Sequence, residues 1–217
     1  MERSKRQRLR AVRLYALLTQ EHCRRAWLET AEMLLEGGVD VLQLREKSLD
    51  GGELLARART LRELTERFSA LLIVNDRPDV AVLAGADGVH LGQSDLPPEE
   101  VRGLVGPDAI IGLSTHTAEQ AAGAEARGAD YVGVGPVFPT DTKGYREGGG
   151  PELVARLCAA TRLPTVAIGG ITPENAGSIV AAGAQAVAAC AALCGADDPQ
   201  DTARTFRRAI EKRKPRA

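Results

Sequence analysis

The sequence predicts an α/β protein built as a single (β/α)₈ TIM barrel, and three observations lead to this fold. Eight short runs rich in Val, Ile and Leu alternate with longer amphipathic stretches, which is typical of repeated βα units. The runs are uniformly apolar, as expected of parallel strands that are covered on both faces. Eight such units in 217 residues fit the lower end of the size range of this barrel. An open doubly wound sheet is the alternative, because alternation alone does not show closure.

The predicted elements follow from these runs and from helix-end signals. The strands cover residues 14–18, 39–44, 71–74, 88–91, 110–113, 131–134, 165–168 and 186–189. The clearest helices cover residues 24–36, 52–68, 118–127, 151–160 and 202–212. Thr117 with Gln120 predicts a capping box, and Thr172 before Pro173 puts a preferred cap residue ahead of a proline at the first helical position.

One turn sequence recurs where helices lead into strands. Its four versions are Gly-Gly-Val-Asp40, Gly-Ala-Asp87, Gly-Ala-Asp130 and Gly-Ala-Gln185. Glycine suits the left-handed residue that often ends a helix. The repeat indicates that one kind of helix-to-strand connection is used around the chain.

Composition favours one domain that acts on small molecules. Hydrophobic residues make up 44% of the chain and the net charge is -1, so a general nucleic-acid binder, which needs a basic face, is not expected. Residues 1–13 are strongly basic and are predicted to be a disordered tail before a catalytic barrel over 14–214. No secretory or membrane-spanning apolar run is present, so we expect a cytoplasmic protein without a membrane partner. The oligomeric state stays open, a homo-oligomer included.

Cations and carboxylates follow neighbouring predicted strands. Gln43, Arg45 and Lys47 come after the second strand, Asn75 and Asp76 after the third, and Asp95 after the fourth. Each aspartate alone is better explained as a helix cap, but consecutive strands of a barrel are neighbours, so the pair of carboxylates favours a shared metal ion. Arg and Lys bind phosphate oxygens, while Mg²⁺ is normally held by one or two carboxylates and the phosphates of a substrate. This arrangement predicts a site for a magnesium-bound diphosphate.

The histidines and Ser114 give weaker signals. Ser114 follows the fifth strand, but no G-x-S-x-G elbow or triad surrounds it, so we expect it to form hydrogen bonds and not to act as a nucleophile. His90 and His116 are expected to be packed or capping imidazoles. His22 is expected to lie away from the active-site end of the barrel.

The last three strands are followed by residues suited to a phosphate. The longest loop, 135–150, contains Thr140, Asp141, Thr142 and Lys143 between glycines, which suits a lid over an anion. Gly169-Gly170 and Cys190-Ala191 follow strands seven and eight. In TIM barrels these two loops frequently bind a phosphate through backbone N–H groups.

The six motifs together resemble the thiamine-phosphate synthase family. They are Gln43-Leu-Arg-Glu-Lys47, Asn75-Asp76, His90-Leu-Gly-Gln-Ser-Asp95, Gly112-Leu-Ser-Thr-His116, Pro139-Thr-Asp-Thr-Lys143 and Ile168-Gly-Gly-Ile171. The resemblance runs from about residue 14 to the last helix. It implies a transferase of thiamine biosynthesis on a TIM barrel, which joins 4-amino-2-methyl-5-(diphosphooxymethyl)pyrimidine to a thiazole (carboxy)ethyl phosphate with release of pyrophosphate.

The same resemblance implies roles for individual residues. The pyrimidine diphosphate would be bound by Gln43, Arg45, Lys47, Asn75, Ser114 and Lys143, of which Arg45, Lys47, Ser114 and Lys143 would be catalytic. One Mg²⁺ would be bound by Asp76 and Asp95. The thiazole phosphate would be bound by Thr140, Asp141, Thr142, Gly170, Cys190 and Ala191. The family usually has a serine at the last of these positions, and Ala191 lacks its hydroxyl.

Two other functions stay open on the same barrel. A thiazole phosphate tautomerase would need the phosphate site but no diphosphate site, and the paired carboxylates beside cations favour the transferase. A non-catalytic sensor of a phosphorylated metabolite is the second alternative, and turnover would exclude it.

Overall fold

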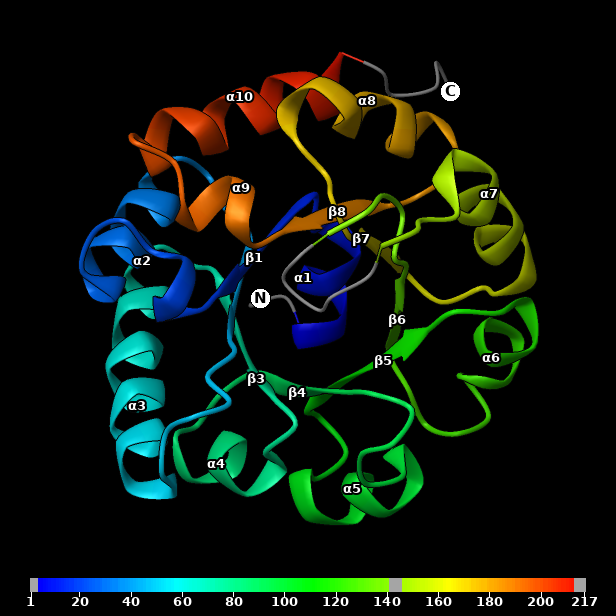
Figure 1. Cartoon of the computed structure of the whole chain (residues 1–217). Coiled ribbons are helices and arrows are strands. Elements are labelled where there is room, and N and C mark those ends of the chain that lie inside the picture. Colours follow the sequence, from blue (N-terminus) through cyan, green and yellow to red (C-terminus); the bar gives the residue numbers. More distant parts are fainter. Residues whose placement is uncertain (1–3, 141–145, 213–217) are drawn as a thin grey trace.

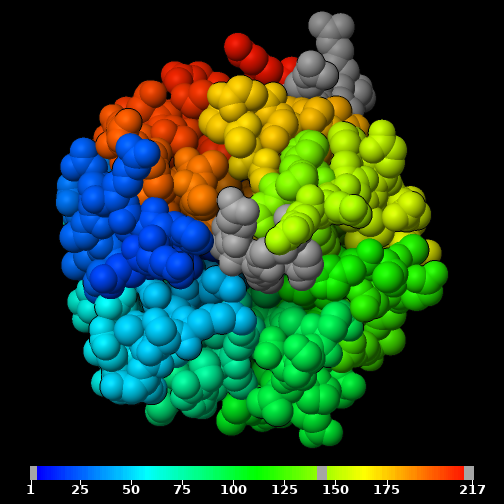
Figure 2. Space-filling view, viewed as in Figure 1, coloured from blue at the N-terminus to red at the C-terminus, as the bar shows by residue number. Residues whose placement is uncertain are grey.

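The computed structural model describes residues 4–140 and 146–212, where eight parallel strands close into one barrel in the order β1 to β8. Helices surround the strands as an outer ring in a view along the barrel axis (Figure 1). The colours of the space-filling view run around this ring in sequence order, so consecutive units are neighbours (Figure 2). The closure confirms the predicted barrel and excludes the open sheet.

The element bounds agree closely with the predicted strands. The strands are β1 (Leu14–Leu18), β2 (Val41–Leu44), β3 (Leu71–Asn75), β4 (Gly88–Leu91), β5 (Ile110–Thr115), β6 (Tyr131–Val134), β7 (Thr165–Ile168) and β8 (Ala186–Ala189). The helices around them are α2 (Trp27–Glu36), α3 (Gly51–Arg67), α4 (Pro78–Leu83), α5 (Pro98–Val105), α6 (Ala118–Gly123), α7 (Gly150–Ala160), α8 (Pro173–Ala181), α9 (Ala191–Cys194) and α10 (Pro199–Glu211), with a 3₁₀ turn η1 (Gln20–His22). The short helices α4, α5 and α9 are not among the predicted ones. No helix in the described part of the chain has the length and apolar character that crossing a membrane requires.

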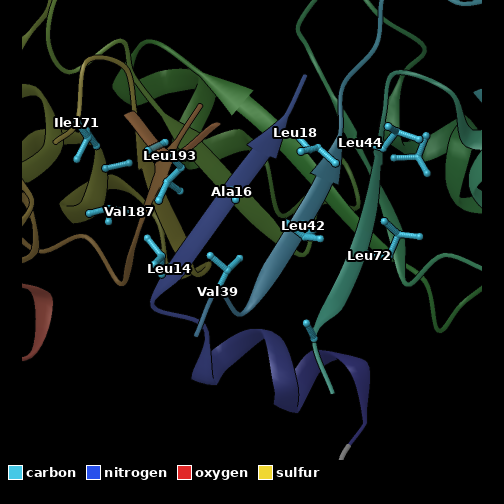
Figure 3. Packing of buried hydrophobic residues seen from close by; sticks show 14 of the residues in the cluster. Leu14, Ala16, Leu18, Val39, Leu42, Leu44, Leu72, Ile171, Val187 and Leu193 are labelled. Carbon is cyan, nitrogen blue, oxygen red and sulfur yellow. The ribbon is translucent and has the colours of Figure 1, made fainter. Parts of the chain in front are cut away.

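Alternate residues of each strand face two separate apolar cores. Leu14, Leu42 and Leu72 belong to the core between the barrel and its helices (Figure 3). Tyr15 and Tyr131 belong to a second cluster, which fills the inside of the barrel. Because successive side chains of a strand point to opposite faces, both sets are buried, and a polar group on either face needs a hydrogen-bond partner.

The basic N-terminal segment is a helix, and the predicted disordered tail over residues 1–13 is wrong there. Helix α1 (Lys5–Ala11) begins at the cap residue Ser4 and lies across the N-terminal ends of the first strands (Figure 3). Leu9 and Val12 are buried in the interior cluster. The segment therefore closes one end of the barrel. Its two buried apolar residues explain why it is ordered, although its many basic residues suggested a solvated tail.

The recurring turn sequence places a carboxylate beside the start of three strands. In each case Oδ2 accepts a backbone N–H near the start of the strand that precedes the turn. The three bonds are Asp40 with Leu14, Asp87 with Leu72 and Asp130 with Ile111, each at 2.9 Å. The turn prediction therefore has a physical basis beyond glycine, because the final aspartate joins two neighbouring strands.

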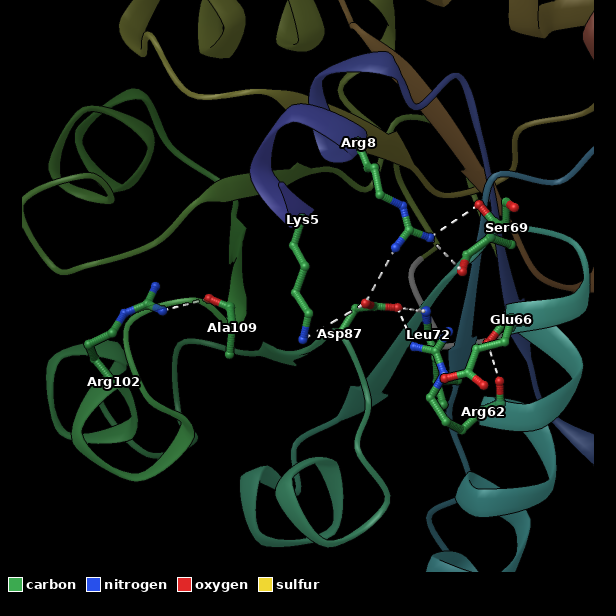
Figure 4. A network of polar contacts seen from close by, with 11 residues as sticks. Lys5, Arg8, Arg62, Glu66, Ser69, Leu72, Asp87, Arg102 and Ala109 are labelled. Carbon is green, nitrogen blue, oxygen red and sulfur yellow. Dashed lines mark hydrogen bonds and ion pairs between the residues drawn. The ribbon is translucent and has the colours of Figure 1, made fainter. Parts of the chain in front are cut away.

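Cations neutralise these carboxylates at the end of the barrel that α1 closes. An arginine pairs with each one: Arg207 with Asp40, Arg62 with Asp87 and Arg102 with Asp130. Helix α1 adds Lys5 and Arg8 near Asp87, as Figure 4 shows. Its basic residues therefore dock the helix onto the barrel, and the opposite end stays available for a site.

Candidate active site

Two adjoining cavities open at the C-terminal ends of the strands, where the sequence predicts the site. The first, here called the charged cavity, has a volume of about 560 Å³. It is lined by Arg45, Lys47, Asn75, Asp76, His90, Gly92, Gln93, Ser94, Asp95, Ser114 and His116. The second, the apolar cavity, has a volume of about 440 Å³ and shares Ser114 and His116 with the first. Two ligands bound in these cavities would therefore meet at Ser114.

Arg45 and Lys47 extend from the end of β2 into the charged cavity. Arg45 is only 9% exposed, yet its Nε has no hydrogen-bond partner, and no carboxylate of the described residues pairs with its guanidinium. The intervening Glu46 turns away and pairs with Arg57 on α3, with 3.5 Å between Oε1 and Nη1. Alternation along the extended chain thus separates the two cations from the acid between them.

Asp76 and Asp95 bring two carboxylates to the same cavity. Asp76 has a left-handed backbone, with φ of 60°, which a non-glycine residue adopts only at a cost. Burial, and then the adjacent Asp95 carboxyl, raise the pKa of Asp76 above its usual range, against the lowering effect of Lys47. The Lys47 ammonium lies 3.7 Å from Asp76 Oδ2, and Asp95 Oδ2 accepts the Gly92 N–H at 2.7 Å.

These carboxylates fit a divalent cation that is shared with a ligand. Burial raises the pKa of Asp76 most, and the repulsion between the two adjacent acids adds to that rise. In the described residues no group of three or more His, Cys, Asp or Glu side chains is placed to hold a metal ion. Two protein carboxylates plus phosphate oxygens are, however, the usual ligands of Mg²⁺.

Gln43 does not line either cavity. It is 2% exposed inside the barrel, where its Nε2 donates to the Tyr15 hydroxyl at 2.7 Å. Ser114 does line both cavities, and its Oγ lies 2.9 Å from His90 Nε2. The other ring nitrogen of His90, Nδ1, lies 2.8 Å from the Tyr131 hydroxyl. His90 therefore links Ser114 to Tyr131 and is neither a simple packing residue nor a helix cap.

The apolar cavity gathers the described residues that were predicted to bind the thiazole phosphate. Thr140, Gly170, Cys190 and Ala191 all line it. A Cβ at Gly170 would lie 2.6 Å from the Pro139 carbonyl oxygen, and its φ is 59°, so glycine is required where these two loops touch. The neighbouring Cys194 thiol lowers the pKa of Cys190, against the raising effect of burial.

His22 also lines this cavity, so its predicted place away from the active-site end is wrong. It belongs to η1, which follows β1 directly and so lies at the same end as the other strand-end loops. Its position after a strand was the signal that could have identified it. Asp141, Thr142 and Lys143 lie outside the described residues.

Sequence reasoning missed the two tyrosines that join Gln43 to His90. Tyr15 and Tyr131 lie near the starts of β1 and β6, and not at the C-terminal strand ends, so they resemble ordinary core residues. Their hydroxyls are 3.0 Å apart, and burial raises the pKa of both phenols. Polar residues at alternate positions of buried strands were the available signal, since such groups must find partners.

The comparisons agree with the residues gathered here. A family model described as thiamine monophosphate synthase matches residues 14–193. The thiamine-phosphate synthase of Chlorobium luteolum is 45% identical over 181 residues, which are 82% of this chain and 85% of that protein. The thiamine-phosphate synthase of Moorella thermoacetica is 44% identical over 191 residues, 87% and 90% of the two chains.

A solved structure supports the same conclusion. The thiamine phosphate pyrophosphorylase from Pyrococcus furiosus superposes with a TM-score of 0.86 at 36% identity and covers 94% of this chain and 98% of that chain. A 3-hexulose-6-phosphate synthase, at 21% identity and a TM-score of 0.67, shares the fold alone. The family match and the identity over most of both chains confirm the resemblance, and the chain belongs to the thiamine-phosphate synthase family of transferases.

Proposed function

We propose that this chain joins a pyrimidine methyl diphosphate to a thiazole phosphate, giving thiamine phosphate and pyrophosphate. The reaction is that of its family, and the two cavities suit it. The charged cavity offers cations and carboxylates for a diphosphate, and the apolar cavity offers walls for a thiazole ring. Their meeting at Ser114 would bring the two reacting carbon and nitrogen atoms together.

The buried Arg45 guanidinium is the observation that carries this proposal. A buried charge is costly unless it is paired, and no described carboxylate pairs with this one. An anionic ligand would supply the missing partner through charge-assisted hydrogen bonds. Lys47, with its side chain 63% exposed, would reach the outer oxygens of the same diphosphate.

Asp76 and Asp95 would hold one Mg²⁺ together with the diphosphate. A bound Mg²⁺ would supply electrostatic stabilisation of the negative charge on the diphosphate. The two carboxylates would bind the ion within the cavity that Arg45 also lines. Asn75 lines the same cavity and would donate hydrogen bonds to the diphosphate or the pyrimidine.

The thiazole phosphate would lie in the apolar cavity. Thr140 and the backbone at Gly170, Cys190 and Ala191 would hold its phosphate, and Asp141 and Thr142 would complete the contact. Apolar residues form the remaining wall, namely Leu17, Ile168, Ile171, Ala188 and Ala189. Such a wall excludes water from a reactive carbon atom.

The chemistry needs charge stabilisation more than proton transfer. The bond between the pyrimidine methylene carbon and the diphosphate oxygen breaks, and the electron pair leaves with pyrophosphate. The thiazole nitrogen then forms the new C–N bond with its free lone pair, so no general base is required. Arg45, Lys47 and Lys143 would stabilise the departing charge, and Ser114 would donate a hydrogen bond beside the reacting atoms.

Pyrophosphate release from purified protein, given both substrates and Mg²⁺, tests this function. Arg45→Gln should lower turnover roughly 100-fold or more, as loss of a charge-stabilising donor does. Arg57→Gln is the matched control, because Arg57 is paired with Glu46 and should leave turnover unchanged. Full activity in Arg45→Gln would contradict the assigned diphosphate site.

The metal assignment and the alternatives have their own outcomes. Asp76→Ala and Asp95→Ala should abolish turnover while the thiazole phosphate still binds, and full activity in both would refute the metal site. Conversion of the thiazole phosphate without the pyrimidine substrate would indicate the tautomerase. Binding without turnover would indicate the sensor. The cytoplasmic location and a homo-oligomer stay predictions.

A further inference from the structure

A continuous line of hydrogen bonds runs through the inside of the barrel to Ser114. Gln43 Nε2 donates to the Tyr15 hydroxyl at 2.7 Å, and the Tyr15 and Tyr131 hydroxyls are 3.0 Å apart. The Tyr131 hydroxyl lies 2.8 Å from His90 Nδ1, and His90 Nε2 lies 2.9 Å from Ser114 Oγ. Residues from the five strands β1, β2, β4, β5 and β6 thus join one amide to the site where the two cavities meet. These five residues are called the hydrogen-bond chain below.

Strand glycines make room for this chain. A Cβ at Gly112 would lie 2.1 Å from Tyr131 Cζ, so any side chain there would collide with the phenol ring. A Cβ at Gly133 would lie 3.2 Å from His90 Cε1. Glycine inside a strand weakens it and often marks a close approach of another group. Here the approaching groups are the Tyr131 and His90 rings of the hydrogen-bond chain, which need the space that the two glycines leave.

The chain has a direction, because each phenol has only one proton to donate. Tyr15 and Tyr131 are buried, and that burial raises the pKa of both phenols, so both stay protonated. Since Tyr15 accepts from Gln43, its own proton points to Tyr131, and the Tyr131 proton then points to His90 Nδ1. Each donor in the line is therefore assigned by the one before it.

The last two links follow from the chemistry of imidazole. A neutral histidine that accepts at Nδ1 carries its proton on Nε2, and this N–H donates to Ser114 Oγ. The Ser114 hydroxyl proton is then turned away from His90. Because Ser114 lines both cavities, that proton would be available to a ligand bound in either of them.

We propose that Gln43, Tyr15, Tyr131 and His90 are positioning residues, which fix the Ser114 hydroxyl as a hydrogen-bond donor to the substrate. The reversed chain would make Ser114 donate to His90, and its oxygen would then repel the lone pairs of an anionic diphosphate. Gln43 therefore acts through the chain and not by contact with the pyrimidine. This inference rests on the proposed function.

The first experiment reads the tautomer of His90 in the wild-type protein. The protein has three histidines, so ¹⁵N spectra of histidine-labelled protein are simple, and His90 is assigned as the set of signals that remains in both a His22→Gln and a His116→Gln variant. The Nε2–H tautomer is expected. A predominant Nδ1–H tautomer would overturn the direction of the chain. This measurement needs no substrate, so it stays informative if the proposed function fails.

The second experiment breaks the hydrogen-bond chain at two links that do not include Ser114. Tyr131→Phe removes the donor to His90, and Gln43→Met removes the donor to Tyr15 with little change of shape. Both should mix the His90 tautomers and lower kcat roughly tenfold, the value of one hydrogen bond to a charged group, with KM values within twofold. If the wild-type protein releases no pyrophosphate, the proposed function is refuted, whereas the tautomer of His90 still tests the direction of the hydrogen-bond chain.

Thr115→Val is the matched control. Thr115 is a buried hydroxyl on the same strand as Ser114, and its Oγ1 donates to the Gly133 carbonyl at 3.0 Å, outside the chain. It should lose stability like the other variants but keep kcat and the His90 tautomer. If the control loses kcat as much as Tyr131→Phe, or if both chain variants keep wild-type kcat, the proposal is overturned.

Discussion

The Asp87 carboxylate accepts the backbone N–H of Leu72 at 2.9 Å, beneath the start of β3 and at the end of the barrel opposite the cavities. The same carboxylate pairs with Arg62 and lies near Lys5 and Arg8 of α1 (Figure 4). One buried acid therefore joins three parts of the molecule: a strand, the helix α3 and the closing helix α1.

Replacing Asp87 should destabilise the fold without affecting the site. Asp87→Ala leaves the Leu72 backbone N–H without its acceptor and leaves Arg62 with only the exposed Glu66 as an ionic partner, so the free energy of unfolding should fall by about 3 kcal/mol or more. Urea unfolding measures it. Asp79→Ala is the control, because its pair with Arg77 is exposed and should cost about 1 kcal/mol or less. Equal losses in the two variants would contradict the role of Asp87.

The docking of α1 predicts a second stability effect. Leu9 is 2% exposed in the interior cluster, so Leu9→Ala should cost about 2–5 kcal/mol and lower the melting temperature. Leu104→Ala on α5 is the control, because that side chain is 54% exposed and should change stability by about 0.5 kcal/mol or less. A neutral Leu9→Ala variant would show that α1 is not part of the barrel core.

The strands and the strand-end residues could be predicted from the sequence, but α1 could not. Uniformly apolar runs mark strands that are buried on both faces, and residues directly after them must lie at one end of a barrel. A helix of seven residues is not stable by local propensity. The burial of Leu9 and Val12 and the pairs with Asp87 and Asp130 add stability, and these partners lie far along the chain.

The hydrogen-bond chain was unpredictable for the same reason. Tyr15 and Tyr131 are 116 positions apart, and their hydroxyls meet only because the barrel closes in one register. Gln43 was assigned to the substrate because alternation sets it on the side of Arg45. The Gln43 side chain does point into the barrel as Arg45 does, but it lies deeper, where it contacts Tyr15 and not the cavity. Alternation gives the face of a residue and not its depth.

Restoring a hydroxyl at position 191 should strengthen thiazole phosphate binding. Ala191 is an exposed residue that lines the apolar cavity, so Ala191→Ser would offer one additional hydrogen-bond donor there. The KM for the thiazole phosphate should fall roughly two- to tenfold, the range of one hydrogen bond, with the KM for the pyrimidine diphosphate unchanged. Steady-state kinetics measure both. Ala182→Ser is the control, because Ala182 lies outside the cavity, and both KM values should be unchanged in it. An unchanged KM for the thiazole phosphate in Ala191→Ser would show that only the backbone contacts the phosphate at this position.

Removing one of the two carboxylates should stabilise the metal-free protein while it abolishes turnover. Asn favours the left-handed backbone that Asp76 adopts, so Asp76→Asn keeps the turn and removes the repulsion from Asp95. Without Mg²⁺ we expect unfolding to require about 0.5 kcal/mol more, since relief of repulsion at an active site commonly stabilises a protein by this amount. Thermal unfolding measures this change, and pyrophosphate release should be lost.

The same variant separates metal binding from charge repulsion. Ligand binding to the folded state raises its melting temperature, so Mg²⁺ added with pyrophosphate should stabilise the wild type. The effect should vanish in Asp76→Asn and persist in Glu99→Gln, which neutralises an acid on α5 that lies outside the cavities. A lower melting temperature of metal-free Asp76→Asn would contradict the expected relief of repulsion, and would mean that the attractions of the Asp76 carboxylate to Lys47 and Asn75 outweigh it.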